Sequence, residues 1–135
     1  MVKRGSSIGF FGMFGRSEDL RRLDAALRQH GLHPSVIPEG AKLAAVSLMA
    51  SGGTGEPPPS AYPSVGELMA FCALGEEDFR GQNGPTRFSA VTERVEKALE
   101  AGEGADAEIV LLMLHAGLIH PVLLDRYDIE AVTEE

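Results

Sequence analysis

Apolar residues recur at helical spacing along most of this 135-residue sequence, and residues that start or stop helices stand between the apolar stretches. The clearest case is the first predicted helix, where Leu20, Leu23 and Leu27 form one apolar stripe. Ser17 is a natural N-cap for this helix and Gly31 is a natural stop. No long run alternates apolar and polar residues, as a half-buried strand would. The sequence therefore predicts an all-α fold, a compact single-domain bundle of five or six short helices.

The remaining helices are predicted from similar signals. The second runs from Pro38 to about Ala50, and a capping box of Ser64 and Glu67 opens the third, which ends near Gly75 or frays as far as Phe79. The others are Pro85 to Ala101, Ala107 to Ala116 capped by Asp106, and Pro121 to about Tyr127. The second and fifth of the six helices are apolar nearly all round, which predicts burial on several sides. The fifth, with the body IVLLML, is our candidate for the central helix of the core. The run RGQNGP predicts a turn, and the alternation after Tyr127 is too short to predict a strand.

Glycine and proline divide the chain without dividing it into domains. The loop GGTGEPPPS can continue neither helix nor strand, but its flanks are too short to hold independent cores. We therefore predict a Gly/Phe-rich N-terminal arm over residues 1–16 and a single helical domain over residues 17–135. Both Gly31 and Gly117 should end their helices in Schellman motifs, with Leu32 folding back on Leu27 and Leu118 on Met113.

The charge balance is acidic and uneven. The net charge is −8, which argues against nucleic-acid binding because that function needs a basic face. Residues 1–50 carry a net charge of +3 and residues 51–135 carry −11, an asymmetry that bears on partners. The single cysteine, Cys72, allows no intramolecular disulfide and fits a reducing cytoplasm, so we expect a cytoplasmic protein. Charge and glycines interrupt the apolar N-terminal stretch, which argues against a secretory signal, and no run is long enough for a transmembrane segment.

Motifs for catalysis or nucleotide binding are missing from the sequence. It contains no P-loop and no GxGxxG after a strand. The last two predicted helices, with Gly117 between them, have the lengths of a DNA-binding helix-turn-helix. However, the second of them offers only Arg126, and the neighbouring Asp125 and Asp128 would repel DNA phosphates. Acidic clusters such as Glu76 to Asp78 stand at helix ends, where solvated carboxylates are expected. Cys72 stands among apolar residues and is predicted to be a core residue. We therefore predict no catalytic residue and no cofactor, and an enzyme is the less favoured class.

Four histidines are weak candidates for metal ligands: His30, His33, His115 and His120. They stand in pairs near the ends of the first and fifth predicted helices, so they could converge if those ends meet. Their spacing does not match HExxH, and a glycine splits each pair. We favour helix capping at the C-terminal end of the helix dipole and predict no metal. A small-ligand or metal-binding helical protein, with a site between helices near these histidines, stays as the alternative function.

The N-terminal arm combines basic and aromatic side chains. Phe10, Phe11 and Phe14 are the predicted partner-binding residues, and they are accompanied by Lys3, Arg4 and Arg16. We predict a protein that acts through protein–protein association, either as a homo-oligomer or with a protein partner in an adaptor or regulatory role. The basic N-terminal part can meet the acidic C-terminal part of a second copy. Peripheral membrane contact through the arm is a third reading and is disfavoured.

Overall fold

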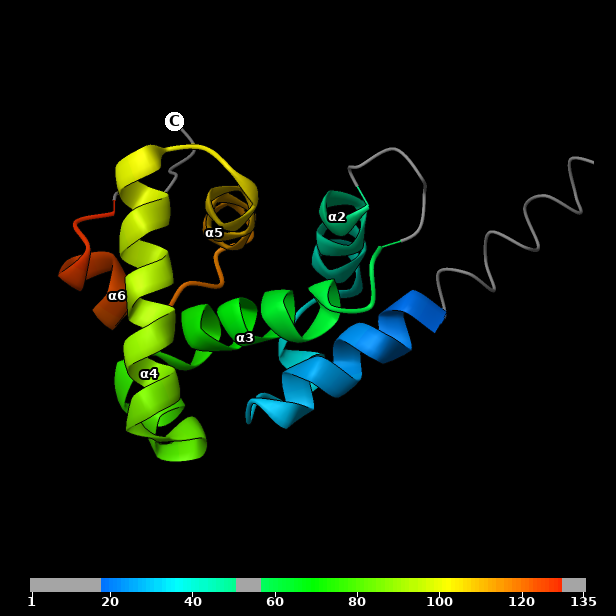
Figure 1. Ribbon diagram of the computed structural model, residues 1–135, viewed down its shortest axis with the longest axis horizontal. Coiled ribbons are helices and arrows are strands. Elements are labelled where there is room, and N and C mark those ends of the chain that lie inside the picture. The colour runs from blue at the N-terminus through cyan, green and yellow to red at the C-terminus, as the bar shows by residue number, and fades with distance from the viewer. Residues whose placement is uncertain (1–17, 51–56, 130–135) are drawn as a thin grey trace, which may run out of the picture.

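A computed structural model describes residues 18–50 and 57–129 of the chain. These residues form helices and turns and contain no strand, which confirms the predicted all-α fold (Figure 1). The predicted N-terminal arm, its neighbour Ser17 and most of the Gly/Pro-rich loop lie outside the described residues. The elements are a first helix over residues 18–29, the short 3₁₀ helix η1 (Pro34–Val36), α2 (Glu39–Met49), α3 (Ala61–Leu74), α4 (Glu76–Ala101), α5 (Ala105–His115) and α6 (Pro121–Arg126).

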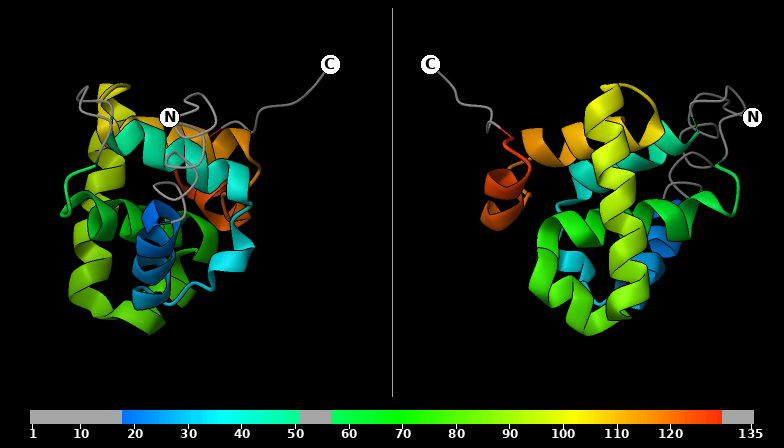
Figure 2. Two further views of the ribbon diagram at one scale, coloured as in Figure 1. Left: turned by 90° about the vertical axis from the view of Figure 1, so that its right-hand side faces the viewer. Right: turned by 60° about the vertical axis from the view of Figure 1, so that its left-hand side comes forward.

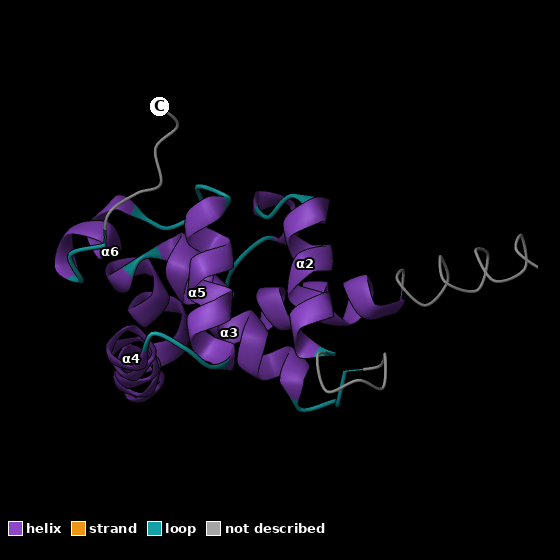
Figure 3. Ribbon diagram, turned by 90° about the horizontal axis from the view of Figure 1, so that it is seen from above, coloured by secondary structure: helices purple, strands orange, loops and turns teal. Residues whose placement is uncertain are grey.

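Helix α3 organises the bundle. Helices α2 and α5 lie on one side of α3, the first helix lies on the other, and α4 crosses near the end of α3 (Figure 1). Seen from above, α2 and α5 run beside each other (Figure 3). The short α6 lies at the end of the molecule that is remote from the start of the first helix, as Figures 1 and 2 agree.

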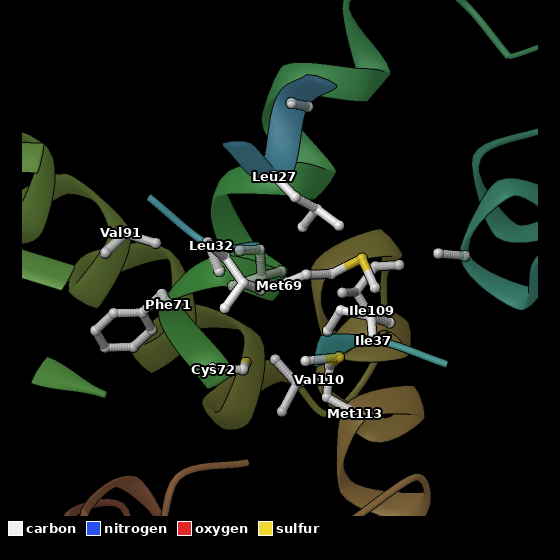
Figure 4. Close-up of a cluster of buried hydrophobic side chains, with 14 of the residues drawn as sticks. Leu27, Leu32, Ile37, Met69, Phe71, Cys72, Val91, Ile109, Val110 and Met113 are labelled. Atoms are coloured by element: carbon white, nitrogen blue, oxygen red, sulfur yellow. The ribbon is translucent and has the colours of Figure 1, made fainter. Parts of the chain in front are cut away.

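The core lies around α3 rather than around α5. Buried residues run without a break from Gly66 to Cys72, because α3 has neighbouring helices on several sides. Side chains from the first helix, α3, α4 and α5 meet there (Figure 4). Helix α5 buries only one face, and its Leu111 is 52% exposed on the opposite side. Helix α5 contacts α2, α3 and α4, but fewer of its residues are buried than those of α3, so the prediction that the fifth helix is the central one was wrong. An apolar sequence does not say how much of a helix its neighbours cover.

Helix α2 also departs from its prediction. Ala45 and Val46 are buried, but Leu43 and Ala44 are only partly covered. The helix contacts α3 and α5, and its Lys42 pairs with Asp24 of the first helix at 3.0 Å. The expected burial on several sides is met only in part, because most of the helix is half-buried and only two of its residues are fully buried.

Two helix ends form as predicted. The Leu32 N–H donates to the Leu27 carbonyl at 3.0 Å, and the Leu118 N–H donates to the Met113 carbonyl at 2.9 Å. Gly31 and Gly117 have φ values of +92° and +71°, the left-handed conformation that this motif requires. Both predicted Schellman motifs are confirmed.

Two helix starts and one turn differ from the predictions. Helix α3 begins at Ala61 instead of Ser64, because Pro63 is tolerated in a first turn, where its missing N–H removes no hydrogen bond. Helix α4 is two helical stretches joined by a kink at Gly84, which has φ 90° and ψ 164°. The second stretch runs from Pro85 to Ala101 as predicted, whereas the first, from Glu76, was not predicted as a separate helix and takes in most of the predicted turn RGQNGP. Gly104 stands at the N-cap of α5 in place of Asp106. The residues predicted to cap α3 and α5 have other partners, described below.

The first helix and α3 approach closely at one glycine. A Cβ on Gly66 would lie 2.6 Å from the Ala26 Cβ, so only a glycine fits between these helices without movement. Ala26 and Gly66 are both buried. This contact fixes the first helix against the central helix of the core.

Candidate functional site

One group of charged side chains holds three helices together. Arg94 of α4 donates from Nε and Nη2 to the Asp106 carboxylate at 3.1 and 2.9 Å. Its Nη1 donates to Glu67 Oε1 at 3.3 Å and to the Ser64 carbonyl at 3.1 Å. Glu67 is only 7% exposed and also pairs with Arg87 at 3.0 Å. We call Glu67, Arg94 and Asp106 the buried clamp after its most buried member, Glu67; the Asp106 side chain is 37% exposed.

Both carboxylates of the clamp are paired with Arg94. Burial lowers the pKa of the Arg94 guanidinium, but the hydrogen bonds and negative charges of Asp106 and Glu67 outweigh burial and raise the pKa above its ordinary value. Asp106 and Glu67 therefore serve to join α5 and α3 to α4, in place of the capping roles predicted for them. The adjacent cavity of about 370 Å³ is lined in part by the same Arg94 and Asp106.

A second group of carboxylates lines a cavity at the junction of α3, α4 and α6. This cavity has a volume of about 410 Å³. We call it the acidic corner, and its lining residues are Leu74, Gly75, Glu76, Glu77, Asp78, Arg80, His120 and Val122. It lies at the end of the molecule that holds α6 (Figures 1 and 2).

Gly75 and His120 build the floor of the acidic corner. Gly75 ends α3 and starts α4 with φ 88° and ψ 176°, a conformation that is essentially restricted to glycine. A Cβ at this position would lie 2.8 Å from the His120 Cγ, so the imidazole covers the glycine closely. The His120 N–H donates to the Cys72 carbonyl at 2.8 Å, which fixes the start of α6 on the end of α3.

The charges in the acidic corner are only partly matched. Glu76 Oε2 pairs with Arg126 Nε at 2.8 Å, and the Arg80 guanidinium lies 4.5 Å from the Phe88 ring centroid. Glu77 and Asp78 are exposed, and within the described ranges neither takes part in an ion pair. All three acids stand in the first turn of α4, where negative charge stabilises the helix dipole. Two carboxylates thus remain available to an incoming cation.

Apolar surface lies beside these carboxylates. Val122 in the first turn of α6 is 49% exposed, and Leu74 at the end of α3 is partly exposed. Both residues line the same cavity as Glu77 and Asp78. The acidic corner therefore offers charge and apolar contact to the same ligand.

The structure does not gather the four histidines. His30 is buried, with Nδ1 3.1 Å from Asn83 Oδ1, whereas His115 is exposed on α5. His33 Nδ1 accepts the Ser35 N–H and His120 Nδ1 accepts the Val122 N–H, both at 3.1 Å. Among the described residues, no three His, Cys, Asp or Glu side chains are arranged to hold a metal ion.

His33 and His120 cap helices, but at the end opposite to the prediction. Each stands before a proline and caps the N-terminus of the element that follows, η1 and α6 respectively. An accepting Nδ1 carries no proton, so this role needs no positive charge. The signal in the sequence is the His–Pro pair at 33–34 and 120–121, because proline suits the first position of a helix.

Cys72 is a core residue, as predicted. Its side chain is buried, and burial raises the pKa of the thiol from 9.0 to about 12. Such a thiol is protonated at neutral pH and is a poor nucleophile.

The predicted partner-binding residues Phe10, Phe11 and Phe14 lie outside the described residues, so their role stays a prediction. The acidic corner was missed because Glu76 to Asp78 read as ordinary first-turn acids. Its other wall comes from α6, more than 40 residues later in the sequence, and no local pattern connects the two.

Within the described ranges, no helix has both the length and the apolar character that a membrane crossing demands. Compared with known proteins, the chain matches no family model, no curated protein and no solved structure.

Proposed function

We propose that this protein acts through protein–protein association, and that the acidic corner is the docking site for a basic segment of the partner. The observation that carries the proposal is the pair of exposed carboxylates, Glu77 and Asp78, beside the half-exposed Val122. The carboxylates of the buried clamp, Glu67 and Asp106, are already held by arginine, as is Glu76 in the corner itself.

The chemistry of this cavity fits a lysine or arginine side chain. Such a side chain has an aliphatic stem, which can lie on Val122 and Leu74, and a cationic head, which can reach the carboxylates. A neighbouring aromatic residue in the same segment would extend the apolar contact. A basic segment that also carries aromatic residues is therefore the best-matched partner.

The wider charge distribution supports the same partner. Residues 57–129 contain twelve acidic and five basic side chains, a net charge of −7. A field of one sign attracts an oppositely charged partner and raises its association rate. We further propose a cytoplasmic setting, supported by the single, buried Cys72.

The proposal is tested by titrating the ¹⁵N-labelled full chain with a capped hexapeptide of alternating lysine and phenylalanine. We expect amide shifts concentrated at Gly75, Glu77, Asp78 and Val122, and none with the corresponding glutamate–phenylalanine peptide. Glu77→Gln with Asp78→Asn should weaken binding by about twofold to thirtyfold, because each exposed ion pair contributes roughly 0.2–1 kcal/mol.

The matched control is Glu93→Gln with Glu100→Gln, which removes the same charge from exposed positions of the same helix. This variant should bind the lysine–phenylalanine peptide like the unmodified chain. Equal weakening by both double variants, or shifts spread evenly over the acidic surface, would show attraction to net charge alone and would overturn the docking site.

A further inference from the structure

We propose that the segment docking in the acidic corner is residues 1–17 of a second copy of this chain. This inference rests on the proposed function and names its partner. It follows from two observations: the composition of that segment, and the opposite ends of the molecule at which the first helix begins and the acidic corner lies.

The composition of residues 1–17 matches the acidic corner. The segment contains Lys3, Arg4 and Arg16 and no acidic residue, so its side chains carry +3. It also contains Phe10, Phe11 and Phe14. These are the two kinds of side chain that carboxylates beside apolar surface would bind.

The position of the corner favours a second copy over the same chain. The first helix begins at one end of the long axis of the molecule, whereas α6 and the acidic corner lie at the other end (Figures 1 and 2). To reach its own corner, the segment would have to run back along the whole helical body. Docking on a second copy does not require the segment to cross the length of its own molecule.

The same placement indicates the arrangement of the copies. If two copies lie antiparallel, each places the start of its first helix near the acidic corner of the other. Each copy then donates one segment and accepts one, which gives a closed dimer with two equivalent contacts. Two linked contacts bind more tightly than one because the second forms within the same complex.

The test is zero-length carbodiimide crosslinking of full-length chain in an equilibrated mixture of ¹⁴N-labelled and ¹⁵N-labelled protein. Lys3 is the only lysine in residues 1–17. We expect mixed-isotope crosslinks from Lys3 to Glu77 or Asp78. Lys42 and Asp24 lie 3.0 Å apart in the same chain and supply the internal control, because their crosslink should carry a single isotope.

Crosslinks of Lys3 to these acids that carry only a single isotope would overturn the inference in favour of a contact within one chain. Crosslinks of Lys3 to carboxylates away from the corner would overturn it in favour of another surface. In either case the peptide titration can still succeed, and the proposed docking of a basic segment then stands with a different partner. Because residues 1–17 would compete with the peptide for the corner, the titration is repeated in the Lys3→Glu/Arg4→Glu variant, and its failure there would remove both proposals.

A charge reversal adds a second readout. Lys3→Glu with Arg4→Glu should abolish the mixed-isotope crosslinks and reduce the dimer fraction, without changing the described helices, which begin at residue 18. Adding Glu77→Lys and Asp78→Lys to the same chain should restore the dimer. Loss of the dimer in the first variant with no recovery in the second, while circular dichroism shows both folded, would contradict the pairing.

Discussion

The buried clamp and the acidic corner are built from the same residue types and differ in what surrounds them. In the clamp, Arg94 binds Asp106 and the nearly buried Glu67, and so joins three helices. In the acidic corner, Glu77 and Asp78 face solvent from the first turn of α4. The clamp carboxylates stabilise the fold, whereas the corner carboxylates are available to a partner. Burial and pairing, and not the density of acids in the sequence, separate the two roles.

The largest effect on stability is expected at Gly75, which lines the acidic corner and joins α3 to α4. Gly75→Ala forces a side chain into a conformation essentially reserved for glycine and brings its Cβ within 2.8 Å of His120. Backbone strain and overpacking together should lower the free energy of unfolding by about 3 kcal/mol. Chemical denaturation measures this change.

Gly84 supplies the matched control for that substitution. It has nearly the same backbone conformation, with φ 90° and ψ 164°, but nothing lies within 4 Å of a Cβ built on it. Gly84→Ala should therefore cost only the backbone strain, about 1–2 kcal/mol. Equal costs for the two variants would mean that the contact between Gly75 and His120 is not tight.

The buried clamp is expected to respond next. Arg94→Met leaves Glu67 buried with only the half-exposed Arg87 as a cation, and should lower the free energy of unfolding by about 2 kcal/mol. Arg87→Met removes the more exposed partner of the same carboxylate and should cost under about 1 kcal/mol. A denaturation curve for Arg94→Met that coincides with that of the unmodified chain would refute the structural role of the clamp.

The dependence of stability on pH tests a second, partly buried contact, the hydrogen bond between Tyr62 and Asp19. Tyr62 Oη donates to Asp19 Oδ1 at 2.8 Å, and burial, with that hydrogen bond, raises the pKa of Tyr62 from 10.0 to about 12. Between these values the unfolded chain has lost this proton and the folded chain retains it. Stability should therefore fall as the pH rises from about 10 to about 12.

The chain has two tyrosines, so Tyr127→Phe leaves Tyr62 as the only one. In that variant the tyrosinate absorbance should rise near pH 12 while the chain is folded. A single step near pH 10 with the helical signal intact would contradict the buried hydrogen bond to Asp19.

Local signals in the sequence predicted much of the fold. The stripe of Leu20, Leu23 and Leu27 and the stops at Gly31 and Gly117 depend on neighbouring residues only, and these predictions hold where the structure describes them. The roles of Glu67 and Asp106 were mistaken because their partner, Arg94, is distant in the sequence. An acidic residue near the start of a helix is expected to accept hydrogen bonds from the helix N–H groups, but a partly buried arginine such as Arg94 competes for the same carboxylate.

The acidic corner was beyond prediction for the same reason. Glu77 and Asp78 were visible as a cluster, but Val122 and His120 join them only through the fold. The hydrogen bond from the His120 N–H to the Cys72 carbonyl brings α6 to this position. No periodicity or composition in either segment indicates that contact.

The smallest effect on stability is expected at the exposed carboxylates of the corner. Glu77→Gln with Asp78→Asn removes favourable first-turn charges and should lower the free energy of unfolding by about 1 kcal/mol or less. The same variant should have the largest effect on association. If the double variant lost as much stability as Arg94→Met, Glu77 and Asp78 would stabilise the fold and would not be available to a partner.

Sedimentation velocity of the untagged full-length chain over a range of concentrations tests the central claim most directly, with Glu77→Gln/Asp78→Asn and Glu93→Gln/Glu100→Gln run beside it. We predict a concentration-dependent dimer for the unmodified chain and for the Glu93/Glu100 variant, and a shift toward monomer for the Glu77/Asp78 variant. The dimer should also weaken as salt is added. A dimer of equal strength in all three proteins, or a monomer throughout, would contradict association of copies through the acidic corner.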